Sequence, residues 1–415
     1  MTPPVALTLP LLAVLVVACA TPARPPDVRS PLPTAAAATA TATASAAAPS
    51  APTPSPTAAV ASAAAAIPSC SAAAELDHWT TERLAWQVIV VPAQVGSLSA
   101  VDAQVGAGAG GVLLFGSTAP GDLAAELVRL ESRAPAGITP LVMSDIEGGD
   151  VERAANLLGP MPSARRLAQT MTPAQIEAYA LSAGRRMRAI GITMDLAPVM
   201  DLDAGPGPTA DDPDGTRSFS DDPGVATADS GAFAAGLAGA GVMPVAKHFP
   251  GLHGAGDNTD LGPARTSPWS QLQQRGLVPF VAAVKQGQAA MMLSNASVPG
   301  LSTLPSSISP QVVAVLRQQL GFTGLILTDS LSAGAIAAIG MSVPDASVAA
   351  LVAGADMVLY SVDAGNATST ARAVAATIAA AVVTGRLPRA QLIASVSRVL
   401  AAKHVDLCAG SRPAS

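Results

Sequence analysis

Residues 325–329 read Leu-Ile-Leu-Thr-Asp, a short run of apolar and β-branched residues that ends in a carboxylate. A run of this length that is apolar at consecutive positions is typical of a parallel strand buried on both faces. In sheets of parallel strands, ligands bind at the carboxyl ends of the strands. Asp329 is therefore a candidate functional residue if the rest of the chain repeats this pattern.

The pattern recurs seven more times, in runs of four or five mostly apolar residues. These runs lie at 88–91, 111–115, 140–144, 193–197, 243–247, 290–294 and 357–360. Small and apolar residues at helical spacing separate them, for example at 173–190, 226–240 and 310–320. Eight strands that alternate with helices predict a closed (β/α)₈ (TIM) barrel that forms a single catalytic domain. A doubly wound open sheet is the alternative, because a local pattern does not reveal closure.

Polar side chains gather at the carboxyl ends of the predicted strands. They are Asp145, Asp195, Asp201, Lys247, His248, Ser294, Asn295 and Asp329. A single polar residue at such a position is usually a cap for the following helix. A set distributed over five strands predicts an active site at this face of the barrel.

The first part of the chain has a different composition. Residues 1–18 carry no charged side chain and contain a short apolar run, which predicts a signal peptide. Residues 16–19 (Val-Val-Ala-Cys) resemble a bacterial lipobox, so we expect lipidation of Cys19, although no basic residue precedes Arg24. The alternative is an ordinary secretory signal with an incidental cysteine. Residues 19–69 are rich in Ala, Pro and Thr and predict a disordered linker, with the barrel domain at 70–410.

These features predict an exported lipoprotein on the extracytoplasmic face of the cell membrane, held there by its lipid anchor. The other two cysteines, Cys70 and Cys408, stand at the two edges of the barrel domain. Disulfides persist in exported proteins, so we expect these two residues to pair. Two unrelated buried thiols are the alternative.

Composition excludes several classes of function. The net charge is −6 and no basic stripe occurs, which argues against nucleic acid binding. Aromatic residues make up 3% of the chain, which favours a short pocket over a long sugar-stacking groove. The acidic run at 211–214 lacks the spacing of a calcium loop, and we interpret it as a solvated surface loop. No metal or nucleotide site stands out, so we expect no metal and no cofactor. We also expect a monomer.

Five motifs carry a resemblance to a known family. Residues 246–251 (Ala-Lys-His-Phe-Pro-Gly) resemble a signature of family 3 glycoside hydrolases, and are closest to their β-N-acetylglucosaminidase branch, which trims peptidoglycan fragments. The resemblance covers roughly residues 75–405. Four further segments match the family in the family's order: 145–149 with Arg153, 195–199 with Asp201, 217–220, and 321–331.

The resemblance implies roles for individual residues. Asp329 would be the nucleophile of a retaining glycosidase, which forms a covalent glycosyl-enzyme that water later hydrolyses. A helix N-cap is the alternative role for this residue. Substrate binding would fall to Asp145, Arg153, Arg217, Lys247 and His248. A structural ion-pair cluster is the alternative for four members of this set, Asp145, Arg217, Lys247 and His248.

The chain also departs from the family at the expected proton donor. The β-N-acetylglucosaminidase branch carries Asp-Ser-His on the loop after the Lys-His motif, and residues 251–261 contain no Asp-x-His. His253 and Asp260 are equal candidates for the general acid/base, and Asp257 ranks third. A second departure is Asp150, where the family usually has a basic residue.

The leading hypothesis is therefore a retaining exo-glycosidase that removes terminal β-N-acetylglucosamine from peptidoglycan-derived glycans. A β-glucosidase-like activity is one alternative, because the family's fold serves both substrates. The missing Asp-x-His motivates another alternative, a lipoprotein that binds muropeptides without cleaving them. In each case the partner is a carbohydrate.

Overall fold

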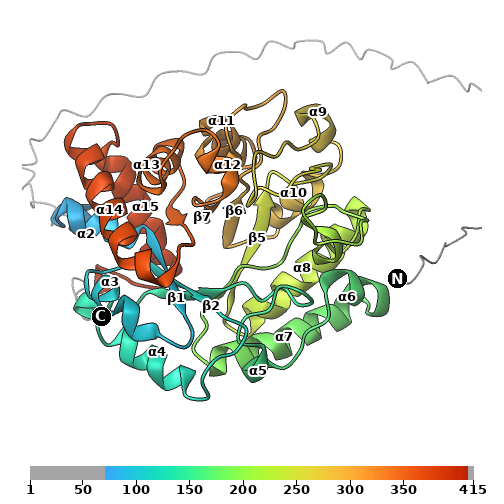
Figure 1. Ribbon diagram of the computed structural model, residues 1–415, viewed down its shortest axis with the longest axis horizontal. Helices are drawn as coiled ribbons and strands as arrows, with labels where there is room; N and C mark the ends of the chain where they lie inside the picture. Colours follow the sequence, from blue (N-terminus) through green and yellow to red (C-terminus); the bar gives the residue numbers. More distant parts are fainter. Residues whose placement is uncertain (1–70, 410–415) are drawn as a thin grey trace, which may run out of the picture. The chain divides into compact units, whose positions relative to one another are not determined.

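The computed structural model describes residues 71–409, and its strands form a closed, all-parallel barrel in chain order (Figure 1). Each strand pairs with the next, and the last pairs with the first through Ile89 and Val358. The predicted (β/α)₈ class is confirmed, and the open sheet is excluded. The strands are β1 (Ile89–Gln94), β2 (Gly111–Phe115), β3 (Leu141–Ser144), β4 (Met194–Asp195), β5 (Met243–Phe249), β6 (Ala290–Leu293), β7 (Leu325–Ser330) and β8 (Met357–Leu359).

Helices surround the barrel, and local sequence signals begin several of them. Thr172 and Gln175 form a capping box at the start of α7, with Pro173 in its first turn. Asp222 caps α8, because its side chain accepts hydrogen bonds from the backbone N–H groups of Gly224 and Val225. The helices are α1 (Ala72–Asp77), α2 (Thr81–Gln87), α3 (Asp102–Gly106), α4 (Leu123–Glu131), α5 (Ala155–Leu158), α6 (Ala164–Thr170), α7 (Pro173–Ala189), α8 (Pro223–Gly239), α9 (Trp269–Leu272), α10 (Val278–Lys285), α11 (Pro310–Ala314), α12 (Gly334–Ala337), α13 (Val343–Ala353), α14 (Ala364–Val383) and α15 (Arg389–Ala402).

Two hydrophobic layers hold the barrel together. Along β1, Val90 points into the barrel interior, whereas Ile89 and Val91 pack against the outer helices. This alternation is the two-residue period of a strand, and both faces are apolar because both are buried. Val90 shares the interior with residues such as Leu113, Met194, Val245, Met292 and Leu327.

Several boundaries differ from the predicted ones in ways that affect the site. β5 extends to Phe249 and β7 to Ser330, so that the predicted strand-end residues His248 and Asp329 lie within strands. β4 is reduced to two residues. The predicted helix at 310–320 is α11 followed by a π-helical turn at Val315–Gln319. Strands β5 and β7 extend because Phe249 pairs with Leu293 of β6 and Ser330 pairs with Leu359 of β8, and a local pattern does not reveal such pairing.

Some expectations fall on residues that the structure does not describe. The signal peptide at 1–18, the lipidation site Cys19, the linker at 19–69 and Cys70 all lie outside the described residues. Cys408 is disulfide-bonded, and its pairing with Cys70 stays a prediction. Among residues 71–409, no helix combines the length and the apolar character that crossing a membrane requires.

Candidate active site

A cavity of about 340 Å³ opens at the carboxyl ends of the strands, where the ring of polar residues was predicted. Apolar side chains from inside the barrel, including Leu113, Leu196 and Met292, form part of its wall. Its size agrees with the expected short pocket. The ionisable side chains that line it are Asp145, Glu147, Arg153, Arg217, Lys247, His248, Asp257, Asp260 and Asp329.

An ion-pair network occupies one wall of the cavity, with Glu147 at its centre. Arg217 donates two hydrogen bonds to Glu147, of 2.7 and 2.9 Å. The ammonium of Lys247 lies 2.6 Å from Glu147 and 2.8 Å from Asp145. The side chains of Glu147 and Lys247 are 3% and 2% exposed. The loop after β3, the strand β5 and the turn Gly215–Arg217 thus meet at one carboxylate.

The network keeps its members charged. Burial alone would raise the pKa of Glu147, but Arg217 and Lys247 outweigh burial and hold this pKa below its usual range. Burial would lower the pKa of Lys247, and Asp145 and Glu147 raise it above its usual range. The ion-pair cluster considered as an alternative therefore exists, and the same residues line the cavity. A sugar hydroxyl in the cavity would meet charged groups, which form stronger hydrogen bonds than neutral ones.

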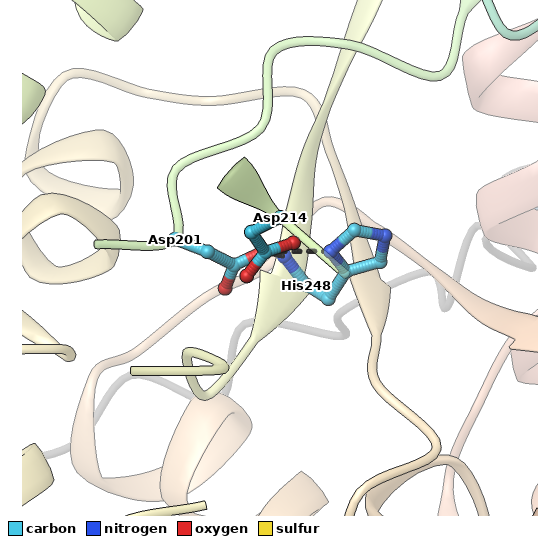
Figure 2. A group of neighbouring side chains, drawn as sticks. All are labelled: Asp201, Asp214 and His248. Atoms are coloured by element: carbon cyan, nitrogen blue, oxygen red, sulfur yellow. Dashed lines mark hydrogen bonds and ion pairs between the residues drawn. The ribbon is translucent and has the colours of Figure 1, made fainter. Parts of the chain in front are cut away.

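His248 is held by a buried carboxylate behind it. Nδ1 of His248 lies 2.6 Å from Asp201, which also accepts the backbone N–H of His248 at 3.0 Å. Figure 2 shows the other ring nitrogen turned away from Asp201. Burial would lower the pKa of His248, but the charge on Asp201 outweighs burial and raises it. Asp201 therefore holds the imidazole in one orientation at the wall of the cavity.

The structure corrects the interpretation of residues 211–214 as a solvated surface loop. Asp211 is exposed, but Asp214 is only 3% exposed and lies beside Asp201 and His248 (Figure 2). The backbone that follows Asp214 is held in place by Arg165. Its guanidinium donates hydrogen bonds to the carbonyls of Gly215 at 2.9 Å and Ser218 at 3.1 Å. Composition did not reveal these distant partners.

Asp201, Asp214 and His248 each place one ligand-type atom within 4.8 Å of the others. The 2.6 Å separation between Asp201 and His248 is a hydrogen-bond distance. Two ligands of a tetrahedral zinc ion, each about 2.0 Å from the metal, would lie roughly 3.3 Å apart. The geometry therefore fits a hydrogen-bonded pair with a third carboxyl group beside it.

Asp329 lies in β7 and lines the cavity. The backbone N–H of Ser330 donates to Asp329 Oδ1 at 2.6 Å. Asn295, from the segment after β6, holds the backbone next to Asp329, because its side-chain amide donates a hydrogen bond to the Ser330 carbonyl at 2.8 Å. The helix-cap alternative does not hold, since the next helix, α12, begins at Gly334 after Ala333.

The two leading candidates for the proton donor lie in different places. Asp260 lines the cavity mouth, as does Asp257. His253 is not among the lining residues, and its Nδ1 lies 3.4 Å from the Leu202 carbonyl. Asp260 is open to solvent on one side, and the surrounding protein still raises its pKa, first by desolvation and next through the charge on Asp329. A raised pKa suits a group that must deliver a proton.

Arg153 and Asp195 also have defined places. Arg153 lines the cavity, with its guanidinium carbon 5.9 Å from the centre of the Phe115 ring. Asp195 is fully buried behind the cavity and accepts the backbone N–H of Ile146 at 3.0 Å. Burial raises its pKa well above the usual range. Asp195 thus supports the loop that carries Glu147.

Comparison with known proteins identifies the family. Residues 101–402 match the model of the glycosyl hydrolase family 3 N terminal domain. The chain belongs to glycosyl hydrolase family 3. It is 40% identical over 279 residues to the β-hexosaminidase LpqI of Mycobacterium tuberculosis, an alignment that covers 65% of this chain and 70% of LpqI.

Solved structures of family 3 proteins have the same fold. A glycosyl hydrolase of this family from Mycobacterium smegmatis is 35% identical, with a TM-score of 0.71 over 80% of this chain and 98% of that chain. The β-N-acetylhexosaminidase of Beutenbergia cavernae is 30% identical, with a TM-score of 0.70 over 79% of this chain and 99% of that chain.

Two residues of this site, Glu147 and Asp214, are not identified from the sequence. Glu147 lies within the motif at 145–149, but the sequence alone assigns it no role. The signal available was charge balance, because Arg217 and Lys247 on one rim need carboxylate partners when they are buried. Asp214 was placed on the surface, and no local signal marks it as buried.

Asp214 leads to a prediction about stability. Its pKa is raised from the ordinary 3.8 to about 7, first by burial and next by Asp201. The native state therefore binds this proton more tightly than the unfolded state, and the resulting stabilisation is full below pH 3.8 and lost as the pH rises through 7. The loss amounts to at most about 4 kcal/mol.

We expect Asp214→Asn to remove this dependence, because an amide does not ionise. Urea unfolding at pH 5 and pH 8 should show a smaller drop in the free energy of unfolding for the variant than for the wild type. Asp211→Asn, on the exposed part of the same loop, is the control and should behave as the wild type does. An unchanged drop in Asp214→Asn would contradict the prediction.

Proposed function

We propose that the chain is a retaining exo-β-N-acetylglucosaminidase that acts on the non-reducing ends of peptidoglycan-derived glycans. The observation that carries this proposal is the position of Asp329, in a short cavity whose wall is a network of charged residues. A cavity of about 340 Å³ suits a terminal sugar. The names of the relatives support the N-acetylhexosamine part, since LpqI is called a β-hexosaminidase.

In the proposed mechanism, Asp329 attacks the anomeric carbon while Asp260 protonates the departing glycosidic oxygen. Water then hydrolyses the glycosyl ester, with Asp260 taking the proton from that water. The cavity residues orient the ring through its hydroxyl and acetamido groups. These residues are Asp145, Arg153, Arg217, Lys247 and His248.

We also propose that the protein is exported and works at the outer face of the cell membrane. Lipidation of Cys19 would anchor it there, and the linker at 19–69 would hold the barrel domain away from the bilayer. A Cys70–Cys408 disulfide would join the two edges of that domain. The domain needs no second copy in this scheme and would act as a monomer.

A comparison of two aryl glycosides tests the function. We expect kcat/KM for an aryl β-N-acetylglucosaminide to exceed that for the aryl β-glucoside at least about a hundredfold, because polar groups that bind the acetamido group lose their partners with the glucoside. The reverse preference would favour the β-glucosidase-like alternative. Binding of a muropeptide without turnover of either glycoside would favour the binding lipoprotein.

A further inference from the structure

The loop that carries Asp260 rests on the segment that follows Asp329. The carbonyls of Thr259 and Asp260 accept hydrogen bonds from the backbone N–H groups of Ala335 at 2.9 Å and Gly334 at 3.0 Å. Gly334 and Ala335 are the first two residues of α12, and the N–H groups of the first turn of a helix have no partner within the helix. The main chain beside the candidate proton donor is thus fixed to the main chain beside the candidate nucleophile.

This contact requires a residue without a side chain at position 334. A Cβ on Gly334 would lie 2.5 Å from the carbonyl carbon of Leu261, and 2.7 Å from both the Leu261 oxygen and the Gly262 nitrogen. All three are backbone atoms, which do not rotate away as the end of a flexible side chain does. Either the loop or the helix must move if this Cβ is added.

Hydrogen bonds within residues 258–262 form a turn, and a further hydrogen bond to Ala210 holds this turn on the side away from α12. The Asn258 carbonyl accepts from Leu261 at 3.0 Å and from Gly262 at 3.2 Å, and its side chain accepts the Asp260 N–H at 2.8 Å. The Asn258 N–H donates to the Ala210 carbonyl at 3.1 Å. A turn held in this way moves as a unit, so a displacement at Gly334 carries Asp260 with it.

We propose that Gly334 is a positioning residue for the proton donor, because its missing side chain lets the backbone at 259–262 dock on α12 and hold Asp260 at the cavity mouth. The inference rests on the proposed function. It means that Gly334, a residue that does not contact the substrate, also affects the rate of the reaction. Relieving a 2.5 Å approach requires a shift on the order of 1 Å, and a misplacement of that size costs about a hundredfold in rate.

The test compares Gly334→Ala with Gly262→Ala. Position 262 lies in the same turn, and a Cβ there meets no atom within 4 Å. We expect Gly334→Ala to lower kcat/KM about a hundredfold on an N-acetylglucosaminide with a poor leaving group. An activated aryl glycoside needs little protonation, so its kcat/KM should change only a few-fold. Gly262→Ala should match the wild type on both substrates.

The pH profile gives a second measurement that general damage to the fold would not move. Desolvation and the charge on Asp329 raise the pKa of Asp260 in the docked loop. Moving the loop into water lowers this pKa, so the donor loses its proton at a lower pH. The alkaline limb of kcat/KM should therefore shift to lower pH in Gly334→Ala and stay in place in Gly262→Ala.

An equal loss on both substrates, or no loss on either, would overturn the positioning role. If Gly334→Ala does not fold, Ala335→Pro removes the hydrogen bond to Thr259 at a position in the first helical turn, where proline is tolerated. It should give the same selective loss, to a smaller extent, and an equal loss on both substrates would again overturn the role.

A wild-type protein without turnover would instead contradict the proposed function. In that case hydrogen exchange of the amides at 258–262 still tests the contact. We expect faster exchange in Gly334→Ala than in Gly262→Ala, and equal rates would refute the docking.

Discussion

Asp329→Asn should lower kcat by at least about 10⁴-fold, the scale on which removing a catalytic nucleophile acts in other hydrolases. An amide cannot form the glycosyl ester through which a retaining mechanism passes. The fold should survive, because Asn keeps a carbonyl oxygen that can accept the hydrogen bond from Ser330. Unfolding in urea should therefore give a midpoint near that of the wild type.

Two measurements bear on this expectation. A mechanism-based fluorinated glycoside should leave its label on Asp329, and mass spectrometry of the digested protein locates the label. Asp363→Asn is the matched control, since this exposed residue follows β8 at the same end of the barrel and does not line the cavity. Its kcat should equal that of the wild type. A label on another carboxylate would contradict the role of Asp329.

Asp260→Ala should lower kcat/KM by about 10²- to 10⁴-fold on substrates with poor leaving groups, the range that general acid catalysis spans. An activated aryl glycoside should still form the glycosyl-enzyme, because its leaving group departs with little protonation. The second step then becomes slow, since no base activates the water. Added azide should restore turnover and yield a glycosyl azide, because a small anion needs no base.

His253→Ala is the control for this experiment, since His253 lies on the same loop but does not line the cavity. It should show neither the selective loss nor the azide rescue. Asp257, which does line the cavity, is the remaining candidate. Rescue in Asp257→Ala or His253→Ala, with none in Asp260→Ala, would move the role to that residue.

The strands were predictable because parallel strands buried on both faces have a local signature. Consecutive apolar residues mark these strands, and Val90 and Leu327, whose side chains lie inside the barrel, belong to two of the predicted runs. The polar residues at the ends of five of these runs identified the active-site face. Helix α7 was predictable for the same reason, since small and apolar residues recur at helical spacing within it.

The pairing of the charged residues was not predictable in the same way. Arg217 and Glu147 are 70 positions apart, and Lys247 and Asp145 are 102 positions apart. Their side chains meet because β3, β4 and β5 pair side by side in parallel, which brings their carboxyl ends to one rim. The burial of Asp214 likewise depends on Arg165, which binds the neighbouring backbone from α6.

The amino-acid sequence by itself determined the alternation of strands and helices, the face that carries the site and the candidacy of Asp329, since each depends on residues that are neighbours along the chain. The closure of the sheet into a barrel was decided by the tertiary structure, through the pairing of β1 with β8. Only the tertiary structure separated Asp260 from His253. Both lie on one loop, and their positions follow from backbone contacts of that loop with Asp201 at one end and Gly334 at the other. Contacts between distant segments leave no local pattern, because either partner alone is compatible with many surroundings.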